Sequence, residues 1–522
     1  MVSLPAPRRT RNARMTTGDK VKSIPELALI LAALRKKKKR IVLCHGVFDL
    51  LHPGHILYFQ AARKHGDVLV VTVTPDALVN KGPNRPVFNQ RLRLESIAAL
   101  ESVDFVALNT GPTAVNTILK LRPHVYAKGQ DYANAASDLT GQIRNEMAAV
   151  KRVGGKTVFT NERMFSSSNL INRFFNVLPM ATQQYLSRFR SRYSAKDVIG
   201  HLRRLSNLRV LVVGEAILDQ YCYCHPLGKS PKDTNVASRF LSEENFAGGS
   251  IAVANHLAGF CSKVTLVSPV GREPSTVNFF RNKLQKNVRF LALKNADRPT
   301  VTKRRFVEPN FLTKMFEVQY LDDTPLPAAM EQQAIEILRQ QLFRHDLVVV
   351  TDYGHGFLTQ RLRQEIGSMA KFLCVNTQTN SANLGFNPAT KYHEIDYVAI
   401  DEPELHLALR TQYGDVSTIA QELRHQIQSR VLLVSRGPNG SIIIGEDGTL
   451  HETPVMSTRV IDRTGAGDAV FAVTSACVFK KVPPEIVGFI GNCVGAMAVE
   501  IVCNREPINP VALSQFIAGI LK

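Results

Sequence analysis

Short runs of β-branched residues alternate with longer helix-like segments from about residue 40 onward, and this alternation constrains the fold more than any other feature. IVLCHGVF (41–48) is followed by HPGHILYFQAARKHG (52–66), and VLVVTVTPD (68–76) starts the next cycle. Strands that alternate with helices of this length predict βα units and hence a parallel, doubly wound sheet. Such sheets bind ligands at the carboxyl ends of their strands, so polar residues at those ends are the candidates for function.

The length and composition indicate two large globular domains. At 522 residues the chain exceeds what one hydrophobic core usually supports. No apolar run reaches the roughly 18 residues that a membrane span requires, and the basic start lacks the apolar segment and cleavage site of a secretory signal. The eight cysteines show no spacing typical of a disulfide framework, so we expect them to be reduced and mostly buried. We therefore expect a cytoplasmic protein without a membrane partner.

The net charge of +21 is unevenly distributed. Residues 1–40 hold twelve Lys or Arg against two Asp or Glu, and residues 188–209 hold seven against one. The basic run 35–40 closes a helix expected to begin near Ser23, where cations complement the helix dipole. Basic clusters bind nucleic acid in some proteins and are solvated faces in more. Nucleic acid is thus an alternative partner rather than the expected one.

The peptide His52-Pro53-Gly54-His55 lies where the helix after the first strand should begin. Two imidazoles can donate hydrogen bonds to phosphate oxygens, and Gly54 lets the backbone approach them. A helix N-terminus that follows a strand end suits the phosphates of a nucleoside triphosphate. The alternative is an ordinary strand and helix with two incidental histidines, because short motifs often match by chance.

Further cations and hydroxyls follow later strands. Lys81 and Arg85 lie in NKGPNRPV, Arg91 begins a helix, and Lys128 lies in KGQDY after another strand. Each could contact an anionic substrate or be a solvated cation. The serines of FSSSNLI (165–171) precede an apolar helix, where they bind phosphate in some proteins and only cap the helix in others.

Residues 40–175 resemble the HxGH nucleotidylyltransferase superfamily, through HGVFDLLHPGH, RPV, QR, ALESVD, KGQDY and SSSNLI. They are most similar to the adenylyltransferase half of the bifunctional heptose-phosphate kinase/adenylyltransferases. The resemblance implies that a substrate phosphate attacks the α-phosphorus of ATP or CTP, with His52 and His55 as catalytic residues. It also implies that the nucleotide or its phosphates are bound by His45, Gly46, Phe48, Gly54, Lys81, Arg85, Arg91, Lys128, Ser166, Ser167 and Ser168.

A second domain begins at Leu208 with the strand-like VLVVGEAILDQY, and its strongest motif is DRTGAGD (462–468). A glycine-rich backbone at a helix N-terminus forms an anion hole for a transferring phosphoryl group. A carboxylate at its edge can take the proton from the attacking hydroxyl, so Asp468 is the candidate general base. A lone GxGD would also fit a simple helix cap.

Residues 208–522 resemble the ribokinase-like sugar kinases. Two segments depart from the pattern of these kinases: Asp401-Glu-Pro-Glu404 replaces Asn-x-x-Glu, and Asn376-Thr377-Gln378 replaces the Asp-Pro-Lys of heptose kinases. Both put the kinase rate and the acceptor in question. The resemblance implies substrate contacts by Asp219, Gly248, Gly249, Asn255, Lys303 and Asp352, nucleotide or phosphate contacts by Ser435, Gly437, Gly440, Gly465, Ala466, Gly467 and Asn492, and a Mg²⁺ ligand in Glu404.

We therefore expect an α/β protein with a Rossmann-like HxGH nucleotidylyltransferase domain and a ribokinase-like domain. The expected divisions are a basic extension (1–39), the nucleotidylyltransferase (40–176), an interdomain segment (177–207) and the kinase (208–522). The expected activity is phosphorylation of a sugar phosphate, by resemblance heptose 7-phosphate at carbon one, and nucleotidyl transfer to the 1-phosphate, giving ADP-heptose and pyrophosphate.

The acceptor, the activity of the kinase half and the oligomeric state stay open at the level of the sequence. The acceptor could be another phosphorylated sugar or polyol, activated with CTP. The kinase half could be weak or regulatory, or the protein could be a nucleotide-dependent nucleic-acid-binding protein. The kinase half comes second here and first in the familiar bifunctional enzymes, and homo-oligomerisation is not decided.

Overall fold

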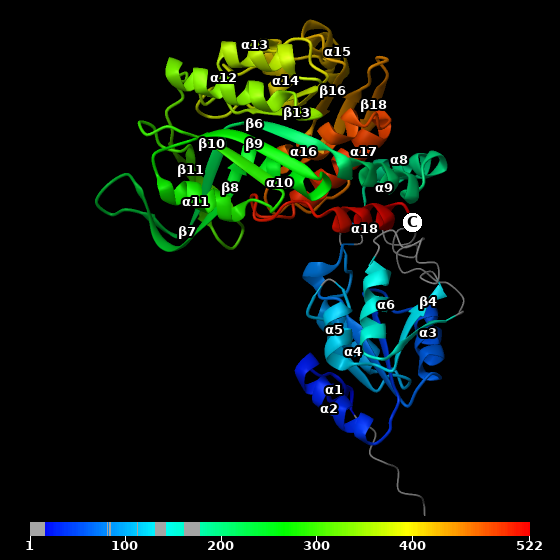
Figure 1. The fold of residues 1–522 in the computed structure, drawn as a ribbon. Coiled ribbons are helices and arrows are strands. Elements are labelled where there is room, and N and C mark those ends of the chain that lie inside the picture. The colour runs from blue at the N-terminus through cyan, green and yellow to red at the C-terminus, as the bar shows by residue number, and fades with distance from the viewer. Residues whose placement is uncertain (1–15, 81, 83–84, 112, 131–141, 161–177) are drawn as a thin grey trace, which may run out of the picture. The chain divides into compact units, whose positions relative to one another are not determined.

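The computed structural model describes residues 16–80, 82, 85–111, 113–130, 142–160 and 178–522. The chain divides into two compact units, one made mainly of residues 1–177 and the other mainly of residues 178–513 (Figure 1). Among the described residues, no helix combines the length and apolar character needed to cross a membrane. All eight cysteines are free and buried, as expected.

A five-stranded parallel sheet organises the N-terminal unit, in the order β3-β2-β1-β4-β5. The order reverses between β1 and β4, and in parallel sheets such a reversal opens a crevice at the carboxyl ends of the strands. This confirms the predicted doubly wound sheet. The strands are β1 (Ile41–Gly46), β2 (Val68–Val73), β3 (Phe105–Leu108), β4 (Val125–Gly129) and β5 (Lys156–Thr160).

Helices cover both faces of this sheet because successive strand residues point to opposite sides. Ile41 and Leu43 of β1 enter one core, and Val42 and Cys44 enter the other. The first core is completed by α2 (Ile24–Lys36), α5 (Val115–Leu121) and α6 (Gln142–Arg152), and the second by α3 (Pro53–Arg63) and α4 (Gln90–Ala98). The remaining short helices are α1 (Thr17–Lys20) and η1 (Asp76–Leu78).

The basic helix near the N-terminus is α2, and it begins and ends where the sequence predicts. Ser23 caps it in a reciprocal capping box with Glu26, and Arg35 and Lys36 occupy its last turn. The cap satisfies N–H groups that have no partner inside the helix, while the cations face the negative end of the dipole.

A nine-stranded sheet organises the C-terminal unit, in the order β10-β9-β6-β13-β14-β15-β16-β17-β18. All neighbours up to β16 are parallel, and β17 and β18 add an antiparallel edge. The strands are β6 (Arg209–Gly214), β9 (Lys263–Val270), β10 (Val288–Lys294), β13 (Leu347–Asp352), β14 (Leu373–Thr377), β15 (Tyr397–Asp401), β16 (Val431–Ser435), β17 (Ser441–Ile444) and β18 (Leu450–Thr453).

A separate four-stranded sheet starts at the carboxyl end of β6. Only Glu215 separates β6 from β7 (Ala216–Lys229), which pairs with β8 (Val236–Gly249) and with β11 (Thr302–Glu308). The two outer strands are β12 (Thr313–Tyr320), which pairs with β11, and β8. Because the link is so short, the start of β7 and the end of β8 lie at the carboxyl edge of the large sheet.

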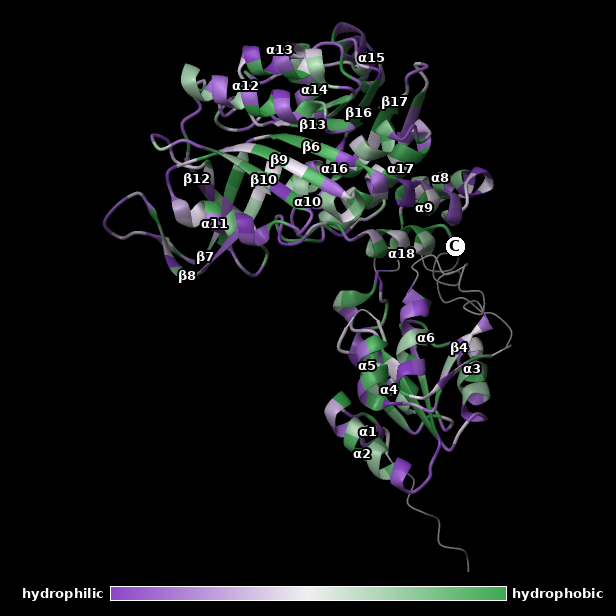
Figure 2. Ribbon diagram, viewed as in Figure 1, coloured by the Kyte–Doolittle hydropathy of each residue, from purple (hydrophilic) through white to green (hydrophobic). Residues whose placement is uncertain are grey.

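Two groups of helices enclose the large sheet. On one face lie α12 (Ala328–Leu342), α13 (Gln360–Met369), α14 (Glu402–Ala408) and α15 (Val416–Gln426), where polar and apolar residues alternate (Figure 2). On the other face lie α10 (Ser250–Phe260), α16 (Ala466–Phe479) and α17 (Pro484–Ala498), which are buried almost all round. The other helices are α11 (Pro274–Lys283), η4 (Ala389–Lys391), η5 (Gly437–Asn439) and α18 (Pro510–Ile520).

Residues 178–207 form α8 (Met180–Arg192), α9 (Ala195–Arg203) and η3 (Arg204–Asn207). The ring of Phe189 stacks on that of Phe489 in α17, with centroids 4.3 Å apart, and the Thr182 hydroxyl donates to the carbonyl of Val455 at 3.1 Å. The segment expected to join the domains thus packs as helices on the C-terminal unit. The division at residues 176 and 207 stays a prediction.

Candidate active sites

The histidines of the HPGH peptide form one stacked pair at the start of α3. His52 is the N-cap and is buried, Pro53 is the first helical residue, and Gly54 lies in the first turn. The rings of His52 and His55 lie 3.9 Å apart between centroids, at 18° to each other. Burial lowers the pKa of His52, which favours its neutral form. The pair therefore presents imidazoles, together with the N–H groups of the helix start, at the carboxyl edge of the sheet.

The residues at the end of β1 hold this pair in place. The ring of Phe48 meets the ring of His55 edge-on, with centroids 5.2 Å apart. Phe48 adopts a left-handed backbone (φ 51°), and a Cβ at Gly46 would come within 2.9 Å of its ring. His45 is buried, with Nδ1 3.0 Å from the hydroxyl of Thr72. Gly46 and Phe48, predicted as nucleotide contacts, thus also shape the loop that carries the histidines.

Arg93 holds together the chain just after β1 and just after β2, and no motif in the sequence singled it out as a site residue. Its guanidinium is fully buried and donates to the carbonyls of Val47 (2.6 Å), Thr74 (2.8 Å) and Phe88 (3.0 Å). It also pairs with Asp76 at 2.5 Å. Arg93 and Ile97 are four residues apart on the buried face of α4, and this helical spacing is the signal that could have identified it.

The other predicted cations of this unit occupy different settings. The side chain of Arg91 is 87% exposed and pairs with Glu95 at 2.9 Å, so its contact with a nucleotide stays a prediction. Lys128 is buried and pairs with Glu146 at 3.1 Å. Burial raises the pKa of Glu146, but Lys128 and His45 more than offset this, and the pKa is lowered overall.

The guanidinium of Arg85 lies near Asp49, which is buried and accepts the N–H of Phe88 at 3.1 Å. Burial lowers the pKa of Arg85, and the Asp49 carboxylate opposes that shift. Four predicted phosphate contacts lie outside the described residues: Lys81, Ser166, Ser167 and Ser168.

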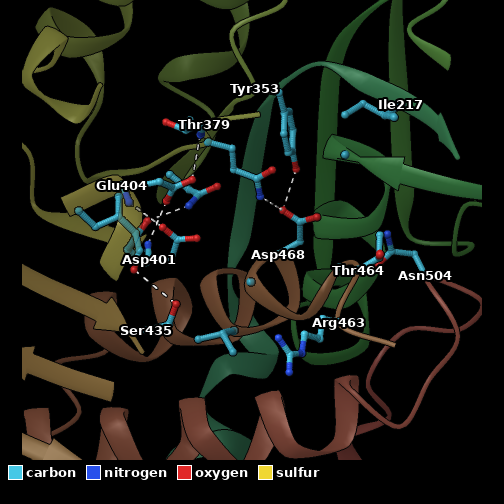
Figure 3. A pocket seen from close by; sticks show the side chains of 18 of the residues that line it. Ile217, Tyr353, Thr379, Asp401, Glu404, Ser435, Arg463, Thr464, Asp468 and Asn504 are labelled. Carbon is cyan, nitrogen blue, oxygen red and sulfur yellow. Dashed lines mark hydrogen bonds between the residues drawn. The ribbon is translucent and has the colours of Figure 1, made fainter. Parts of the chain in front are cut away.

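A cavity of about 330 Å³ lies at the carboxyl edge of the large sheet (Figure 3). Successive strands each contribute to it at or just after their ends, as expected for a parallel sheet. Asp468 lies between two groups of side chains, with Asp401, Glu404 and Ser435 on one side and Ile217, Thr464 and Asn504 on the other. Further lining residues include Asp219, Gly249, Lys303, Arg305, Tyr353, Asn376, Gln378, Thr379, Arg463, Gly465 and Gly467.

Asp468 carries the features of a general base. Its Oδ1 atom accepts the hydroxyl of Tyr353 at 2.9 Å and the side-chain amide of Gln378 at 3.1 Å. Burial raises its pKa to about 7, with a further contribution from the Asp219 carboxylate, and these effects outweigh the two hydrogen bonds and Lys303. A carboxylate with a pKa near neutrality can both accept and release a proton at physiological pH.

The backbone around Gly465 begins α16 beside this carboxylate. Gly465 is the N-cap with a left-handed backbone (φ 85°), and a Cβ there would lie 2.1 Å from the Asn504 side chain. No side chain fits at this position. The N–H group of Ala466 donates to the carbonyl of Arg463 at 3.3 Å. Gly467 lines the cavity in the first turn of α16, where N–H groups lack partners inside the helix and can bind an anion.

One side of the cavity is built by the four-stranded sheet. Asp219 of β7 is buried and accepts from Arg305 at 2.5 Å, and Arg305 also contacts Glu317 at 2.6 Å. A Cβ at Gly248 would lie 1.9 Å from Oδ2 of Asp219, so the glycine makes room for this carboxylate. Gly249 has φ 59° and precedes α10. Asp219, Gly249 and Lys303, which the sequence singled out separately, line one cavity.

Lys303 is the cation that this network leaves for a ligand. Its side chain is buried and lines the cavity, and within the described part of the chain its ammonium forms no hydrogen bond or ion pair. Burial lowers its pKa, while Asp219 opposes the shift. A buried ammonium gains most from an anionic partner.

Asp401 and Glu404 place two carboxylates at the opposite end. Both oxygens of Glu404 accept backbone N–H groups, from Thr379 and from Asp401, each at 2.9 Å. Burial and the neighbouring Asp401 raise the pKa of Glu404 to about 8. Hard oxygen donors next to each other suit Mg²⁺, whose charge would relieve the repulsion between them. Among the described residues, no group of three or more metal-ligating side chains is preassembled.

Several predicted contacts lie away from the residues that line this cavity. Asn255 holds the backbone of Lys283 and Gln285, both at 3.0 Å, and Asp352 is buried against Lys391 and Tyr392, both at 2.6 Å. Asn492 donates to Ser441 at 2.6 Å. Gly440 has φ 81°, and a Cβ there would lie 2.0 Å from the carbonyl of Thr453; Gly437 begins η5.

Comparisons with known proteins agree with this geometry. Residues 207–502, more than half of the chain, match the pfkB family carbohydrate kinase model. Residues 43–174 match the Cytidylyltransferase-like model. The protein is a member of the pfkB carbohydrate kinase family that carries a cytidylyltransferase-like domain ahead of the kinase domain.

Two curated relatives share the name Bifunctional protein HldE. The one from Geobacter sulfurreducens is 40% identical over 162 residues, which is 30% of this chain and 31% of the relative. The one from Nitrobacter hamburgensis is 28% identical over 310 residues, 58% of this chain and 62% of the relative. The matches thus span from about a third to three fifths of the relatives' length. The crystal structure of phosphofructokinase-2 from Escherichia coli in complex with potassium is 16% identical, covers 60% of this chain and 99% of its own, and has a TM-score of 0.48.

Proposed function

We propose that the protein is a bifunctional sugar-activating enzyme. Its kinase half transfers the γ-phosphoryl group of ATP to a sugar phosphate, and its nucleotidylyltransferase half joins a nucleotide to the resulting 1-phosphate. Heptose 7-phosphate, phosphorylated at carbon one, is the proposed acceptor, and ADP-heptose plus pyrophosphate are the proposed products. The resemblance of both halves to heptose-phosphate kinase/adenylyltransferases supports this choice. Both reactions consume a nucleoside triphosphate, so we place them in the cytoplasm.

The single observation that carries the kinase proposal is the setting of Asp468. The carboxylate lies beside the N-terminus of α16 and shares its cavity with Asp219 and Lys303. In the proposed step Asp468 takes the proton of the acceptor hydroxyl as its oxygen bonds to the γ-phosphorus. The bond from that phosphorus to the bridging oxygen of ADP breaks, and ADP leaves. The N–H groups at the start of α16 stabilise the charge on the transferring group.

Lys303 and Asp219 are the proposed acceptor contacts. Asp219 can accept a hydrogen bond from a sugar hydroxyl, and the Lys303 ammonium, which no carboxylate neutralises directly, can bind the acceptor's own phosphate. Arg305 also lines the cavity, but Asp219 and Glu317 already pair with its guanidinium, so its proposed role is to orient Asp219.

Magnesium fits the nucleotide end of the cavity. We propose Glu404 and Asp401 as the groups that hold it, directly or through water. Mg²⁺ would neutralise the polyphosphate charge when bound. The protein's own contribution there is the fixed position of Glu404, which the N–H groups of Thr379 and Asp401 hold from both sides.

For the nucleotidylyltransferase half we propose direct attack by the sugar 1-phosphate on the α-phosphorus of the triphosphate. A phosphate oxygen of the sugar forms the new bond, the bond to the β-phosphate oxygen breaks, and pyrophosphate leaves. No protein nucleophile is required. His52 and His55 would donate hydrogen bonds where charge develops, and their stacking at the start of α3 supports their acting together.

The test follows both products in one preparation. Wild-type protein with ATP or CTP, magnesium and a panel of sugar phosphates should release ADP in the first step and pyrophosphate in the second. Asp468→Asn should abolish phosphorylation and still release pyrophosphate from supplied sugar 1-phosphate, while His55→Ala should do the reverse. Unchanged pyrophosphate release in His55→Ala would refute the assignment of the histidines. Comparison of ATP with CTP identifies the nucleotide.

A further inference from the structure

Gln378 lies between the proposed base and the strand that supplies it. The residue follows β14 directly and takes the place at which heptose kinases typically have a lysine. Its side-chain Nε2 donates to Oδ1 of Asp468 at 3.1 Å, the same oxygen that accepts the Tyr353 hydroxyl at 2.9 Å. Among the described residues, no hydrogen bond reaches Oδ2. The two donors therefore occupy one oxygen and leave the other for a ligand.

The backbone of Gln378 is fixed on both sides. Its N–H donates to the carbonyl of Asp352 at 2.9 Å. Its carbonyl accepts the side-chain amides of Asn383 at 3.0 Å and Asn387 at 3.1 Å. These three hydrogen bonds fix the backbone of Gln378 at the position from which its side-chain amide reaches the carboxylate.

The same loop also fixes the second donor. The side chains of Asn380 and Asn383 donate to the carbonyl of Tyr353, at 2.7 Å and 3.1 Å. Tyr353 is buried, and its N–H donates to Glu215 at 3.2 Å. The asparagine-rich segment 380–387 thus positions both groups that hold Asp468, although none of its asparagines touches the carboxylate.

We propose that Gln378 is a positioning residue for the base: with Tyr353 it holds Oδ1 of Asp468, so that Oδ2 receives the proton of the acceptor hydroxyl. This inference rests on the kinase function proposed above. It gives a role to Gln378 within Asn376-Thr377-Gln378, the segment that replaces the Asp-Pro-Lys of heptose kinases. A glutamine supplies the hydrogen bond without a positive charge. A lysine at the same place would add a cation and make the carboxylate a weaker base.

The charged groups around Asp468 determine how strongly a cation at residue 378 would change the basicity of this carboxylate. Asp219 faces it from β7, Lys303 from β11, and Glu404 from α14, while Tyr353 contributes a neutral hydroxyl. The cavity that holds Asp468 is also lined by Asp401, Arg305 and Arg463, so its charged lining is mixed. Because the local charge is not dominated by cations, replacing one neutral donor by a cation should be measurable.

The experiment compares Gln378→Met, Gln378→Lys and wild type in the full chain. For Gln378→Met we expect kcat for phosphorylation to fall by at least about tenfold with little change in the KM for ATP. The acid limb of its pH profile should move to higher pH. For Gln378→Lys the acid limb should move to lower pH, on the order of one pH unit. Gln364→Met, an exposed glutamine of α13, is the matched control and should behave as wild type.

Two results would overturn the proposal. One is a Gln378→Met variant with the wild-type kcat and pH profile. The other is a variant that loses activity together with its melting temperature while its acid limb stays in place, since this describes a purely structural residue. If wild type phosphorylates nothing in the panel, the kinase function fails separately. The ¹³C NMR titration of the Asp468 carboxyl still tests Gln378, because an identical titration in wild type and Gln378→Lys refutes its role.

Discussion

Lys314 and Asp462 form an ion pair, with Nζ 2.8 Å from Oδ1, that joins the four-stranded sheet to the peptide preceding α16. Asp462 is buried, and its other oxygen accepts the Tyr221 hydroxyl at 2.6 Å and the N–H of Cys503 at 3.0 Å. Lys314 also contacts the hydroxyl of Thr464. The strand β12 and the proposed anion hole are thus held by one carboxylate.

We expect Lys314→Met to weaken phosphorylation. The buried carboxylate of Asp462 would lose its cation, which should destabilise the C-terminal unit by about 1–3 kcal/mol. A lower kcat for phosphorylation and a lower melting temperature are the expected readouts, with pyrophosphate release unchanged. Lys286→Met removes an exposed lysine and is the control. Equal effects of the two substitutions would show that the ion pair does not matter.

Stability should depend on pH through Asp468. The pKa of this carboxyl is raised from 3.8 to about 7 in the folded protein, so the folded state holds a proton between these values that the unfolded state releases. Stability therefore falls as pH rises from about 4 to 7, and the full cost is present above pH 7. Asp468→Asn should remove a cost of a few kcal/mol.

The melting temperatures of wild type and Asp468→Asn, measured from pH 4 to pH 8, check this. The variant should be the more stable protein at pH 8, and the difference should vanish near pH 4. A difference that does not change with pH would show that Asp468 titrates normally. The kinase rate should fall below pH 7 for the same reason, because the base must be ionised.

Replacing Arg93 by methionine should reduce stability and nucleotidyl transfer far more than replacing Arg91, on the same helix. Arg93→Met removes the four hydrogen bonds of a fully buried guanidinium. We expect the free energy of unfolding to fall by about 3–5 kcal/mol and the nucleotidyl-transfer activity to be lost. Arg91→Met removes a single exposed ion pair and should cost less than about 1 kcal/mol. Urea unfolding and pyrophosphate release measure both effects. A larger loss of pyrophosphate release in Arg91→Met would instead show that Arg91 contacts the substrate.

Gly248→Ala should impair acceptor binding more than folding. A Cβ at this position would lie 1.9 Å from Oδ2 of Asp219, so the carboxylate must move. We expect the acceptor KM to rise at least about tenfold, with a smaller change in the KM for ATP. Gly367→Ala in α13 meets nothing within 4 Å and should stabilise that helix slightly. Unchanged acceptor kinetics in Gly248→Ala would argue against Asp219 as an acceptor contact.

The strands and the starts of helices could be predicted because they depend on local pattern. IVLCHGVF predicts β1, and Ser23 predicts the start of α2, since periodicity and capping act over a few residues. The parallel order then places the ends of β15 and β16 at one edge, so that Glu404 and Ser435 line one cavity, to which α16 adds Asp468.

The direction of individual side chains could not be predicted in this way. Asp352 is the last residue of β13 and Gln378 directly follows the neighbouring parallel strand β14, yet Gln378 binds Asp468 while Asp352 pairs with Lys391. Asn255 lies on the helix after Gly249, and its side-chain amide donates to the carbonyl of Lys283 and accepts the N–H of Gln285. Such choices depend on contacts between residues far apart in the chain, and those contacts have no local signature.

The clamp made by Arg93 has a consequence for how the N-terminal unit meets its ligand. Because one guanidinium binds the carbonyls of Val47, Thr74 and Phe88, these three backbone positions are held together when the unit folds. A triphosphate that arrives at the end of β1 then finds these segments preorganised, so their conformational entropy is not lost a second time on binding. Binding there should therefore require little ordering of the protein backbone.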